Sequence, residues 1–295
     1  MLSYLGIDVG GSFIKYGILQ QAEFVQKGSV ATPKDGYTSF ATELKEIVSE
    51  ALSYPLKGIG ICVPGKVNSD TGLVEYGGSL PYLHGKNLVA EIRKFTSLPV
   101  FVENDGKSAT RAEAFSGNLK DIDQGAAIVL GTGVGSGYIL NGQLRTGAHH
   151  QSGEVSFMVQ DNKIRGLESF VAQQLSGVQL VHDLAAILGV EPDGPKVFEL
   201  VTRDGKGMAH LRNYGKRVAL FIFNLQTVLD VKRYVIGGGV SAQPLLIEVI
   251  NEGFEQIRGI HPVISLTLTR PEIMAAKYRE DANLLGVISY FLQEV

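Results

Sequence analysis

The sequence predicts an α/β protein of roughly two domains, and three observations support that fold class. Short aliphatic runs alternate along the chain with stretches of helical period, which is typical of strands alternating with helices. A strand, a glycine turn, a second strand and a further turn occur twice, near residues 10 and 133. The length of 295 residues suits roughly two domains of about 150 residues each.

The composition is that of a globular protein with a sizeable core. Hydrophobic residues make up 44% of the chain and charged residues 19%, which excludes global disorder. The net charge of −3 argues against a nucleic-acid partner, because phosphate neutralisation needs a cationic surface. The single cysteine, Cys62, excludes an internal disulfide and favours a reduced, cytoplasmic compartment. No targeting segment or membrane span is indicated, so we expect no membrane partner.

The first half of the chain predicts a hairpin followed by alternating helices and strands. The predicted strands cover residues 4–9, 13–19, 23–29, 58–63 and 99–103, and the predicted helices cover residues 38–52, 88–96 and 105–117. Residues 64–85 are rich in glycine and are expected to be irregular. Because a strand follows the first glycine turn, the pattern disfavours an NAD-dependent dehydrogenase, whose fingerprint places a helix there.

The second half restarts after a break at residues 121–125. Asn141-Gly142 predicts a hairpin turn between two short strands. The predicted strands cover residues 126–130, 136–140, 233–236 and 266–268; helices are predicted at 245–257 and 282–294, and largely helical structure at 167–188 and 196–230.

The first glycine turn, Gly10-Gly11-Ser12, is a candidate phosphate site. Glycine N–H groups can surround phosphate oxygens without interference from a Cβ atom. Ser12 adds a hydroxyl donor and Lys15 a positive charge, while Asp8 at the strand end could orient Mg²⁺ or its waters. A plain tight turn with a surface lysine is the alternative interpretation.

Two further glycine loops could contribute similar backbone chemistry. Gly131-Thr132-Gly133 belongs to a stretch with glycine at every second position, which removes side chains from one face of a strand. Gly237-Gly238-Gly239 follows a predicted strand and precedes a helix, where a nucleotide's phosphate or adenosine could lie against the backbone. Close strand packing and a bland turn are the respective alternatives. Three such loops in one chain favour a ligand.

Three carboxylates are candidates for chemistry. Asp105 begins a predicted helix after a buried strand and could accept a proton from a hydroxyl nucleophile, although a helix N-cap is the alternative. Glu154 and Glu168 could each accept hydrogen bonds from two sugar hydroxyls, or could be solvated surface acids. The adjacent pair His149-His150 does not predict a metal site, since neighbouring side chains tend to point apart.

Together these motifs resemble the ROK family of bacterial sugar kinases, within the actin-like ATPase superfamily. The resemblance runs nearly from end to end of the chain. It is carried by residues 6–12 with Lys15, by Pro64-Gly65 with Val67, and by residues 102–105, 131–135, 153–154, 167–168, 236–241 and 281–286.

The resemblance implies a two-domain actin-like ATPase fold, which is ribonuclease H-like, with a cleft between the domains. Residues 1–118 and 282–295 would form the small domain, and residues 119–281 the large one. ATP with Mg²⁺ would lie in the cleft, and a homodimer is expected. Asp105 would be the catalytic base, and Gly65, Asn104, Asp105, Glu154 and Glu168 would bind the sugar. The nucleotide side would consist of Asp8, Gly10, Gly11, Ser12, Lys15, Gly131, Thr132, Gly133, Gly237, Gly238 and Gly239.

Two departures from the family pattern bear on the substrate. Zinc-bearing members carry a histidine that touches the sugar three residues after the Gly-Glu glutamate, and this chain has Phe157 there. Residues 159–165 also hold no cysteine, so no structural zinc is expected. Ser79-Leu80-Pro81-Tyr82 stands where the family often has Asn-Leu-Pro-Gly, in a loop that borders the sugar.

We therefore expect an ATP-dependent sugar kinase that transfers the γ-phosphate to a hexose-type hydroxyl, with O6 as the first candidate. N-acetylmannosamine and glucose are the candidate substrates. The alternatives are a β-glucoside kinase acting on cellobiose-type sugars, or a non-catalytic sugar sensor of the same fold. The family's DNA-binding repressors carry an N-terminal helix-turn-helix, for which a phosphate motif starting at residue 6 leaves no room.

Overall fold

The computed structural model describes residues 2–160 and 164–292 and divides into two compact units. The first unit comprises Met1–Phe115, Thr146–Ser152 and Glu280–Val295; the second comprises Ser116–Arg145 and Gly153–Arg279. The segment Thr146–Ser152, which the sequence assigns to the large domain, therefore belongs with the first unit. The last two residues of the helix predicted at 282–294 lie outside the described residues.

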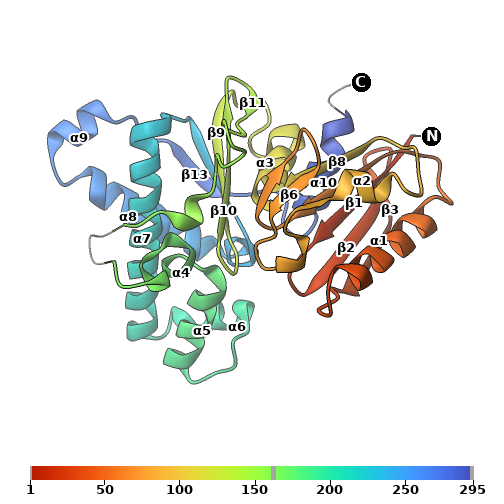
Figure 1. Ribbon diagram of the computed structural model, residues 1–295. Helices are drawn as coiled ribbons and strands as arrows, with labels where there is room; N and C mark the ends of the chain where they lie inside the picture. Colours follow the sequence, from red (N-terminus) through yellow and green to blue (C-terminus); the bar gives the residue numbers. More distant parts are fainter. Residues whose placement is uncertain (1, 161–163, 293–295) are drawn as a thin grey trace. The chain divides into compact units, whose positions relative to one another are not determined.

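A five-stranded sheet forms the centre of the first unit (Figure 1). Its strand order is β3-β2-β1-β4-β8, in which β1, β2 and β3 are antiparallel neighbours and β1, β4 and β8 run parallel. The bounds are β1 (Ser3–Val9), β2 (Phe13–Gln20), β3 (Glu23–Ala31), β4 (Leu56–Val63) and β8 (Val100–Asn104). The hairpin predicted around the first glycine turn is thus confirmed.

Helices complete the core of this unit. They are α1 (Tyr37–Ala51), α2 (Leu88–Ile92), α3 (Asp105–Ser116) and α10 (Ala282–Leu292). Helix α1 buries an apolar face that includes Phe40 and Leu44 in the same core as the strands. Helix α10 packs against β1 and β4, where a Cβ atom on Gly60 would lie only 2.7 Å from Val287. Glycine in β4 therefore lets the C-terminal helix approach the sheet closely.

The stretch predicted to be irregular contains a small antiparallel sheet. Its strands are β5 (Lys66–Asn68), β6 (Leu73–Tyr76) and β7 (Lys86–Asn87), with the 3₁₀ turn η1 (Pro81–Leu83) between β6 and β7. Strands of two to four residues are too short for an alternating pattern to stand out in the sequence. The helix predicted at 88–96 is shorter in the structure, because α2 ends at Ile92.

The second unit contains a five-stranded sheet with the matching order β11-β10-β9-β12-β13 (Figure 1). Its strands are β9 (Gln124–Leu130), β10 (Val134–Leu140), β11 (Gln143–Leu144), β12 (Arg233–Gly237) and β13 (Glu272–Ala275). Its helices are α4 (Val171–Gln174), α5 (Gly177–Leu188), α6 (Gly194–Val201), α7 (Gly205–Leu229), α8 (Pro244–Arg258) and α9 (Pro262–Thr267). Two antiparallel pairs and two parallel pairs recur in both sheets, so the topology is duplicated.

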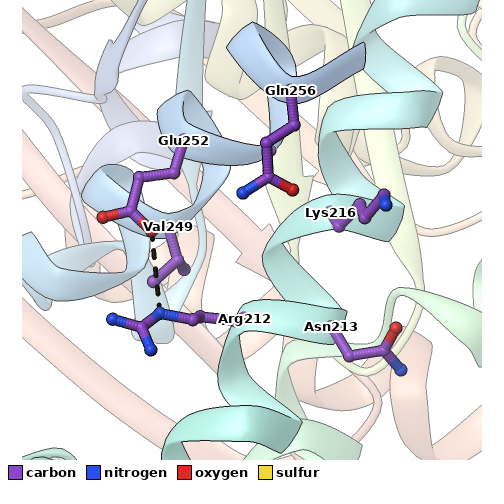
Figure 2. Close-up of a pocket in the computed structure, with 7 residues that line it drawn as sticks. Arg212, Asn213, Lys216, Val249, Glu252 and Gln256 are labelled. Atoms are coloured by element: carbon purple, nitrogen blue, oxygen red, sulfur yellow. Dashed lines mark ion pairs between the residues drawn. The ribbon is translucent and has the colours of Figure 1, made fainter. Parts of the chain in front are cut away.

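The longest helix, α7, packs along α8 in this unit. A hollow of about 210 Å³ lies beside them, and two of its lining residues, Arg212 and Glu252, form an ion pair at 3.7 Å. Figure 2 shows these residues on α7 and α8. None of the candidate site residues lines this hollow. In the described part of the chain, no helix combines the length and the apolar character that a membrane crossing requires.

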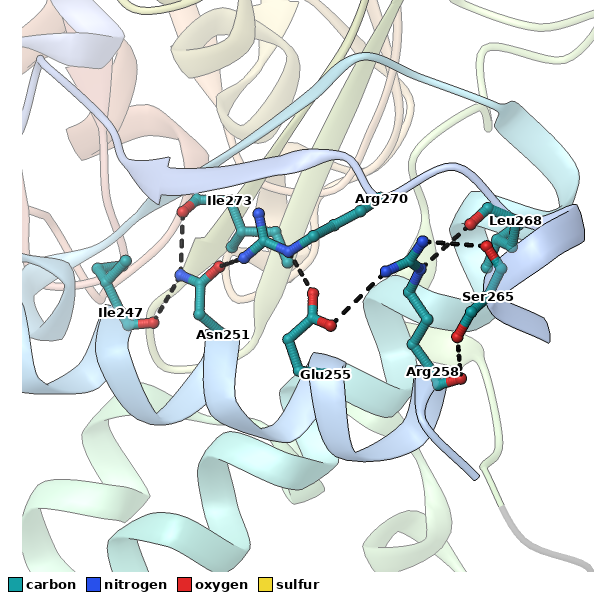
Figure 3. A network of polar contacts seen from close by, with 8 residues as sticks. All are labelled: Ile247, Asn251, Glu255, Arg258, Ser265, Leu268, Arg270 and Ile273. Carbon is teal, nitrogen blue, oxygen red and sulfur yellow. Dashed lines mark hydrogen bonds and ion pairs between the residues drawn. The ribbon is translucent and has the colours of Figure 1, made fainter. Parts of the chain in front are cut away.

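The strand predicted at 266–268 is wrong, because most of those residues belong to helix α9. Pro262 occupies the start of this helix, a position that proline favours. Figure 3 shows how Arg258 of α8 holds the helix end: its guanidinium donates to the carbonyls of Ser265 at 3.1 Å and Leu268 at 3.3 Å. A contact with a distant side chain thus stabilises a turn whose local sequence favours a strand.

Candidate active site

Three polar side chains lie side by side at the carboxyl ends of parallel strands in the first unit. Asp8 of β1 is in register with Cys62 of β4, which is in register with Glu103 of β8. The Cys62 thiol donates a hydrogen bond to Asp8 Oδ1 at 3.2 Å, and Asn283 Nδ2 donates to the same atom at 3.1 Å. Ligands of α/β proteins characteristically bind at this edge of a parallel sheet.

The negative charge of the Asp8 carboxylate is energetically unfavourable in this buried position. Burial raises the pKa of the Asp8 carboxyl, although the hydrogen bonds from Cys62 and Asn283 and the charge of Lys15 oppose that shift. Burial also raises the pKa of the Cys62 thiol, and the negative charge of Asp8 adds to that effect, so the thiol remains a donor. Both donors reach Oδ1, so neither contact uses Oδ2. A carboxylate with one oxygen outside these contacts fits a hard divalent cation or its bound water.

The first glycine loop is braced by the segment that follows β3. Gly10 N–H donates to the Phe13 carbonyl at 2.9 Å, which closes the turn. Thr32 Oγ1 donates to the Gly10 carbonyl at 2.7 Å, and the Lys34 ammonium donates to the Gly11 carbonyl. Sequence reasoning missed Thr32 and Lys34, because nothing in the local pattern connects residues 32–34 with residues 10–12.

Lys34 is the more informative of the two missed residues. Its side chain is exposed, yet its ammonium group is held at the carbonyl of Gly11 within the candidate phosphate loop. Lys15, the predicted cation, lies on β2 directly opposite Asp8 in the hairpin register. The loop thus has a cation on each side, one from β2 and one from the turn after β3.

The start of α3 holds the predicted base. Asp105 Oδ1 accepts hydrogen bonds from the N–H of Gly106 at 2.8 Å and from Asn104 Nδ2 at 3.0 Å. Asn104 is the residue that caps the helix, since its Oδ1 accepts the N–H of Lys107 at 3.1 Å. The alternative interpretation of Asp105 as the N-cap is therefore wrong, and its carboxylate is oriented at the first helical position instead.

Asn104 also ties the base to the predicted sugar loop. Its Nδ2 donates to the carbonyl of Gly65 at 2.9 Å as well as to Asp105. Gly65 has φ +89°, and a Cβ atom there would lie 2.1 Å from the Tyr76 carbonyl, so glycine is required. These bonds use both protons of the amide, which leaves only Oδ1 of Asn104 able to interact with a sugar hydroxyl.

Two fully buried charged residues support this segment, and sequence reasoning assigned neither of them a role. Glu103 is 0% exposed, and its Oε1 accepts bonds from Ser69 Oγ and from the Asn104 N–H, both at 2.9 Å. Arg111 Nη2 lies 3.8 Å from the other oxygen of Glu103. Lys107 is 1% exposed and donates to the His150 carbonyl at 2.6 Å. Only the tertiary structure brings the segment Thr146–Ser152 to this helix.

The second unit contains the remaining glycine loops, and their glycines differ in what the fold demands. A Cβ atom on Gly238, which has φ +90°, would lie 2.2 Å from the Leu130 carbonyl, so the fold itself requires this glycine. Within the described residues, a Cβ atom on Gly131 or Gly133 would meet nothing closer than 3.6 Å, and one on Gly239 nothing within 4 Å. Close strand packing therefore does not explain these three glycines.

Room beside the backbone is what these open glycines have in common. The loop is closed by the Gly131 N–H donating to the Gly133 carbonyl at 3.0 Å, and Ser176 Oγ donates to the Gly131 carbonyl at 3.2 Å. A loop that is fixed in place, with open space at both of its glycines, suits the close approach of a phosphate.

The two predicted sugar carboxylates both belong to the second unit. Glu154 precedes the 3₁₀ turn η2 (Val155–Phe157), and Glu168 lies within η3 (Leu167–Ser169). A β-bridge between Val159 and Phe170 brings the segments that carry them together. Gly153 has φ +93°, and its carbonyl accepts from Ser136 Oγ of β10 at 3.1 Å, which anchors the turn before Glu154.

His149 and His150 lie in the first unit, close to acidic residues. His150 Nε2 is 3.7 Å from Asp70 Oδ2, and the Lys66 ammonium contacts Glu75 in the adjoining small sheet. Among the described residues, no group of three His, Cys, Asp or Glu side chains could hold a metal ion. Residues 161–163 of the stretch considered for zinc lie outside the described part of the chain.

The geometry agrees with the similarity found to known proteins. The model of the ROK family matches residues 4–294. The chain belongs to the ROK family. A β-glucoside kinase from Listeria monocytogenes is 27% identical over 294 residues, which cover 97% of this chain and 96% of that protein. An N-acetyl-D-glucosamine kinase from Escherichia coli O1:K1 is 27% identical over 96% of this chain and 97% of its own length.

A solved ROK structure establishes the fold class. The crystal structure of a ROK family protein from Streptococcus pneumoniae TIGR4, in complex with sucrose, superposes with a TM-score of 0.86. Its sequence is 27% identical, and the match covers 99% of this chain and 98% of that one. The duplicated sheet order is thus that of the actin-like ATPase fold found in ROK sugar kinases, as the sequence predicts.

Proposed function

We propose that this ROK protein is an ATP-dependent sugar kinase that transfers the γ-phosphoryl group to a hexose-type hydroxyl, O6 being the first candidate. The observation that carries the proposal is the start of α3, where Asn104 caps the helix and the carboxylate of Asp105 is oriented at the first helical position. A carboxylate oriented by two hydrogen bonds at a helix N-terminus is suited to accept a hydroxyl proton.

In the proposed reaction Asp105 orients the sugar hydroxyl and takes its proton as the oxygen attacks the γ-phosphorus. Phosphoryl transfer depends mainly on positioning and on stabilisation of charge. The backbone N–H groups of Gly11, Ser12, Thr132 and Gly133 would donate to the phosphates, because those of Gly10 and Gly131 already close their loops. Lys15 and Lys34 would supply positive charge, and the Gly237–Gly239 loop would lie against the adenosine. Asp8 would hold Mg²⁺ through water, and the ion would supply charge that neutralises the phosphates.

The acceptor sugar would be held by residues from several elements. Glu154 and Glu168 would each accept bonds from sugar hydroxyls, and Gly65 would bring backbone groups to the ring. Asn104 has only Oδ1 left for a sugar hydroxyl, so we assign it mainly to orienting Asp105. N-acetylmannosamine and glucose remain candidate substrates, with β-glucosides of the cellobiose type as the alternative.

Sugar-stimulated release of ADP tests the proposal. The purified protein is incubated with ATP-Mg²⁺ and glucose, N-acetylmannosamine, N-acetylglucosamine, fructose or cellobiose, and ADP is measured against a control without sugar. We expect at least one sugar to stimulate release. Absence of stimulation by any sugar, with sugar binding intact by calorimetry, would overturn the kinase assignment in favour of the non-catalytic sensor.

We also propose that the protein is a homodimer in the cytoplasm. The family resemblance is its support, together with the single buried cysteine, Cys62, which suits a reducing compartment. Light scattering on the eluting protein would test the dimer: a mass near 64 kDa supports it, and a mass near the 31.8 kDa of one chain contradicts it.

A further inference from the structure

Large apolar side chains are exposed beside both candidate sugar carboxylates. Phe157, which ends the turn that follows Glu154, is 66% exposed. Leu167, the residue before Glu168, is 75% exposed. Singly scattered exposed apolar residues are normal, but two that flank a pair of candidate ligand-binding groups call for an explanation.

Phe170 contacts both turns that carry these residues, one through its ring and the other through its backbone. The Phe157 ring meets the Phe170 ring edge to face, with centroids 6.4 Å apart. The Leu167 carbonyl accepts the Phe170 N–H at 3.1 Å, which closes the turn η3. We call Phe157, Leu167 and Phe170 the apolar shelf. Both turns that carry it are attached to α4, so the shelf has a fixed support.

The local fold explains the position of the shelf but not its exposed side chains. Val155 and Ser169 are the buried residues of the two turns, so they anchor η2 and η3 in the core. The backbone bonds that close the turns, such as Met158 N–H to the Val155 carbonyl at 2.9 Å, do not depend on the identity of residue 157. The backbone bonds of both turns would therefore form equally well with polar residues at positions 157 and 167.

We propose that the apolar shelf binds a second ring attached to the acceptor sugar, so that the preferred substrate is a disaccharide or an aryl glycoside rather than a free monosaccharide. This inference rests on the proposed function. A pyranose ring carries its hydroxyls around the rim and exposes C–H groups on its faces. An aromatic ring beside carboxylates that bind hydroxyls accommodates such a face. The C–H groups of the sugar carry slight positive charge, and the face of the aromatic ring is negative.

The geometry favours a ring over a smaller apolar group such as an N-acetyl methyl. The shelf extends from the turn after Glu154 to the turn that contains Glu168, joined through Phe170. An acetyl methyl would cover only part of the Phe157 ring, whereas a pyranose or phenyl ring presents a face of similar size to it. The acceptor hydroxyls would remain with the two carboxylates, and the ring would extend over the shelf.

The test compares kcat/KM for glucose, N-acetylglucosamine, cellobiose and phenyl β-glucoside in wild type and in Phe157→Ala. We expect cellobiose and phenyl β-glucoside to exceed glucose in the wild type. Phe157→Ala should lower kcat/KM for both ringed substrates about tenfold or more, while glucose changes less than about twofold. Leu167→Ala should act in the same direction with a smaller effect, and Phe157→Tyr should retain the preference.

Matched controls and a binding readout separate this inference from the proposed function. Val228→Ala removes a side chain that is 80% exposed on α7, and it should leave all four substrates unchanged. Calorimetric binding of cellobiose without ATP should weaken in Phe157→Ala, whether or not the protein turns over. Equal losses of kcat/KM for glucose and cellobiose in Phe157→Ala would overturn the proposed role of the apolar shelf. So would a wild-type preference for N-acetylglucosamine. Loss of turnover with ring-dependent binding retained would instead contradict the kinase.

Discussion

The two sheets share one strand order but carry different chemistry at matching positions. The last but one residue of the central strand is Asp8 in the first unit, and it lies opposite Lys15. The matching residue in the second unit is Val129, and it lies opposite Gly135. The first unit therefore places charged side chains beside its glycine loop, whereas the second presents backbone alone.

This difference shows how a duplicated topology can divide a reaction between its copies. In the first unit a buried acid, a thiol and an asparagine lie at adjacent strand ends and lead to the base. In the second unit glycines with open space form the loops at the corresponding ends. The charged groups proposed to orient Mg²⁺ and to accept a proton belong to the first copy, whereas both copies are proposed to contribute groups that bind phosphate and sugar.

The largest effect is expected from a substitution that removes the candidate base, Asp105, of the first unit. Asp105→Asn should lower kcat by about a thousandfold or more, because the amide cannot accept the hydroxyl proton. The Kd for ATP should stay within about twofold, because Asn retains the bonds to Gly106 and Asn104. Steady-state ADP release and nucleotide titration measure the two quantities. A kcat within tenfold of the wild type would remove Asp105 as the base.

A smaller effect is expected from filling the open loop of the second unit. Gly133→Ala should weaken ATP binding about tenfold without lowering the free energy of unfolding, because the new methyl group meets no close atom of the described fold but occupies the phosphate side. Nucleotide titration and urea denaturation provide the two measurements.

Two glycines of the same unit serve as controls for Gly133→Ala. Gly205→Ala, at the open start of α7, should change neither ATP binding nor stability adversely. Gly238→Ala should destabilise the fold by a few kcal/mol, because of its positive φ and the Leu130 carbonyl. If Gly133→Ala lowers the free energy of unfolding as much as Gly238→Ala does, the fold rather than a ligand requires glycine at position 133.

Asp8 provides a pH-dependent test of the charged strand ends. Its pKa is raised in the folded protein, so the folded state holds the proton more tightly than the unfolded state does. Stability from this group therefore falls as pH rises from the unfolded value of 3.8 through the raised folded value. Asp8→Asn should raise the free energy of unfolding at pH 7 relative to pH 4, because it removes the cost of burying the charge.

The same substitution should weaken ATP-Mg²⁺ binding, because the carboxylate that orients the metal is lost. In the wild type, this binding should weaken on acidification at a pH above the ordinary aspartate range, since protonation removes the charge. Denaturation at pH 7 and pH 4 and titrations over the same range check both effects. A destabilised Asp8→Asn protein would show that the carboxylate is structural rather than functional.

The smallest expected effect concerns the cation that sequence reasoning missed. Lys34→Met should raise the KM for ATP about two- to fivefold with kcat nearly unchanged, because an exposed charge contributes modestly to phosphate binding. Lys57→Met, which removes another exposed lysine of the first unit, should leave the KM unaltered. Identical KM values in both variants would assign phosphate binding to the loop and Lys15 alone.

Short-range patterns account for most of what could be predicted. The hairpin at Gly10-Gly11-Ser12 and the turn at Asn141-Gly142 follow from glycine and asparagine chemistry within a few residues. The strand at 266–268 was wrong because the Arg258 contacts that hold α9 are not local in the sequence. The strands β5, β6 and β7 were missed because they are too short to show alternation.

The sequence by itself determined the fold class, the positions of most central strands along the chain and the family, since each depends on patterns that can be read residue by residue. Only the structure decided that Asn104 rather than Asp105 caps α3, which glycines the fold requires, and that Glu103, Lys107 and Lys34 support the candidate site. Apart from the cap, those features depend on hydrogen bonds and close approaches between residues far apart in the chain. Spacing along the sequence does not encode such distances, because packing of the strands and helices sets them.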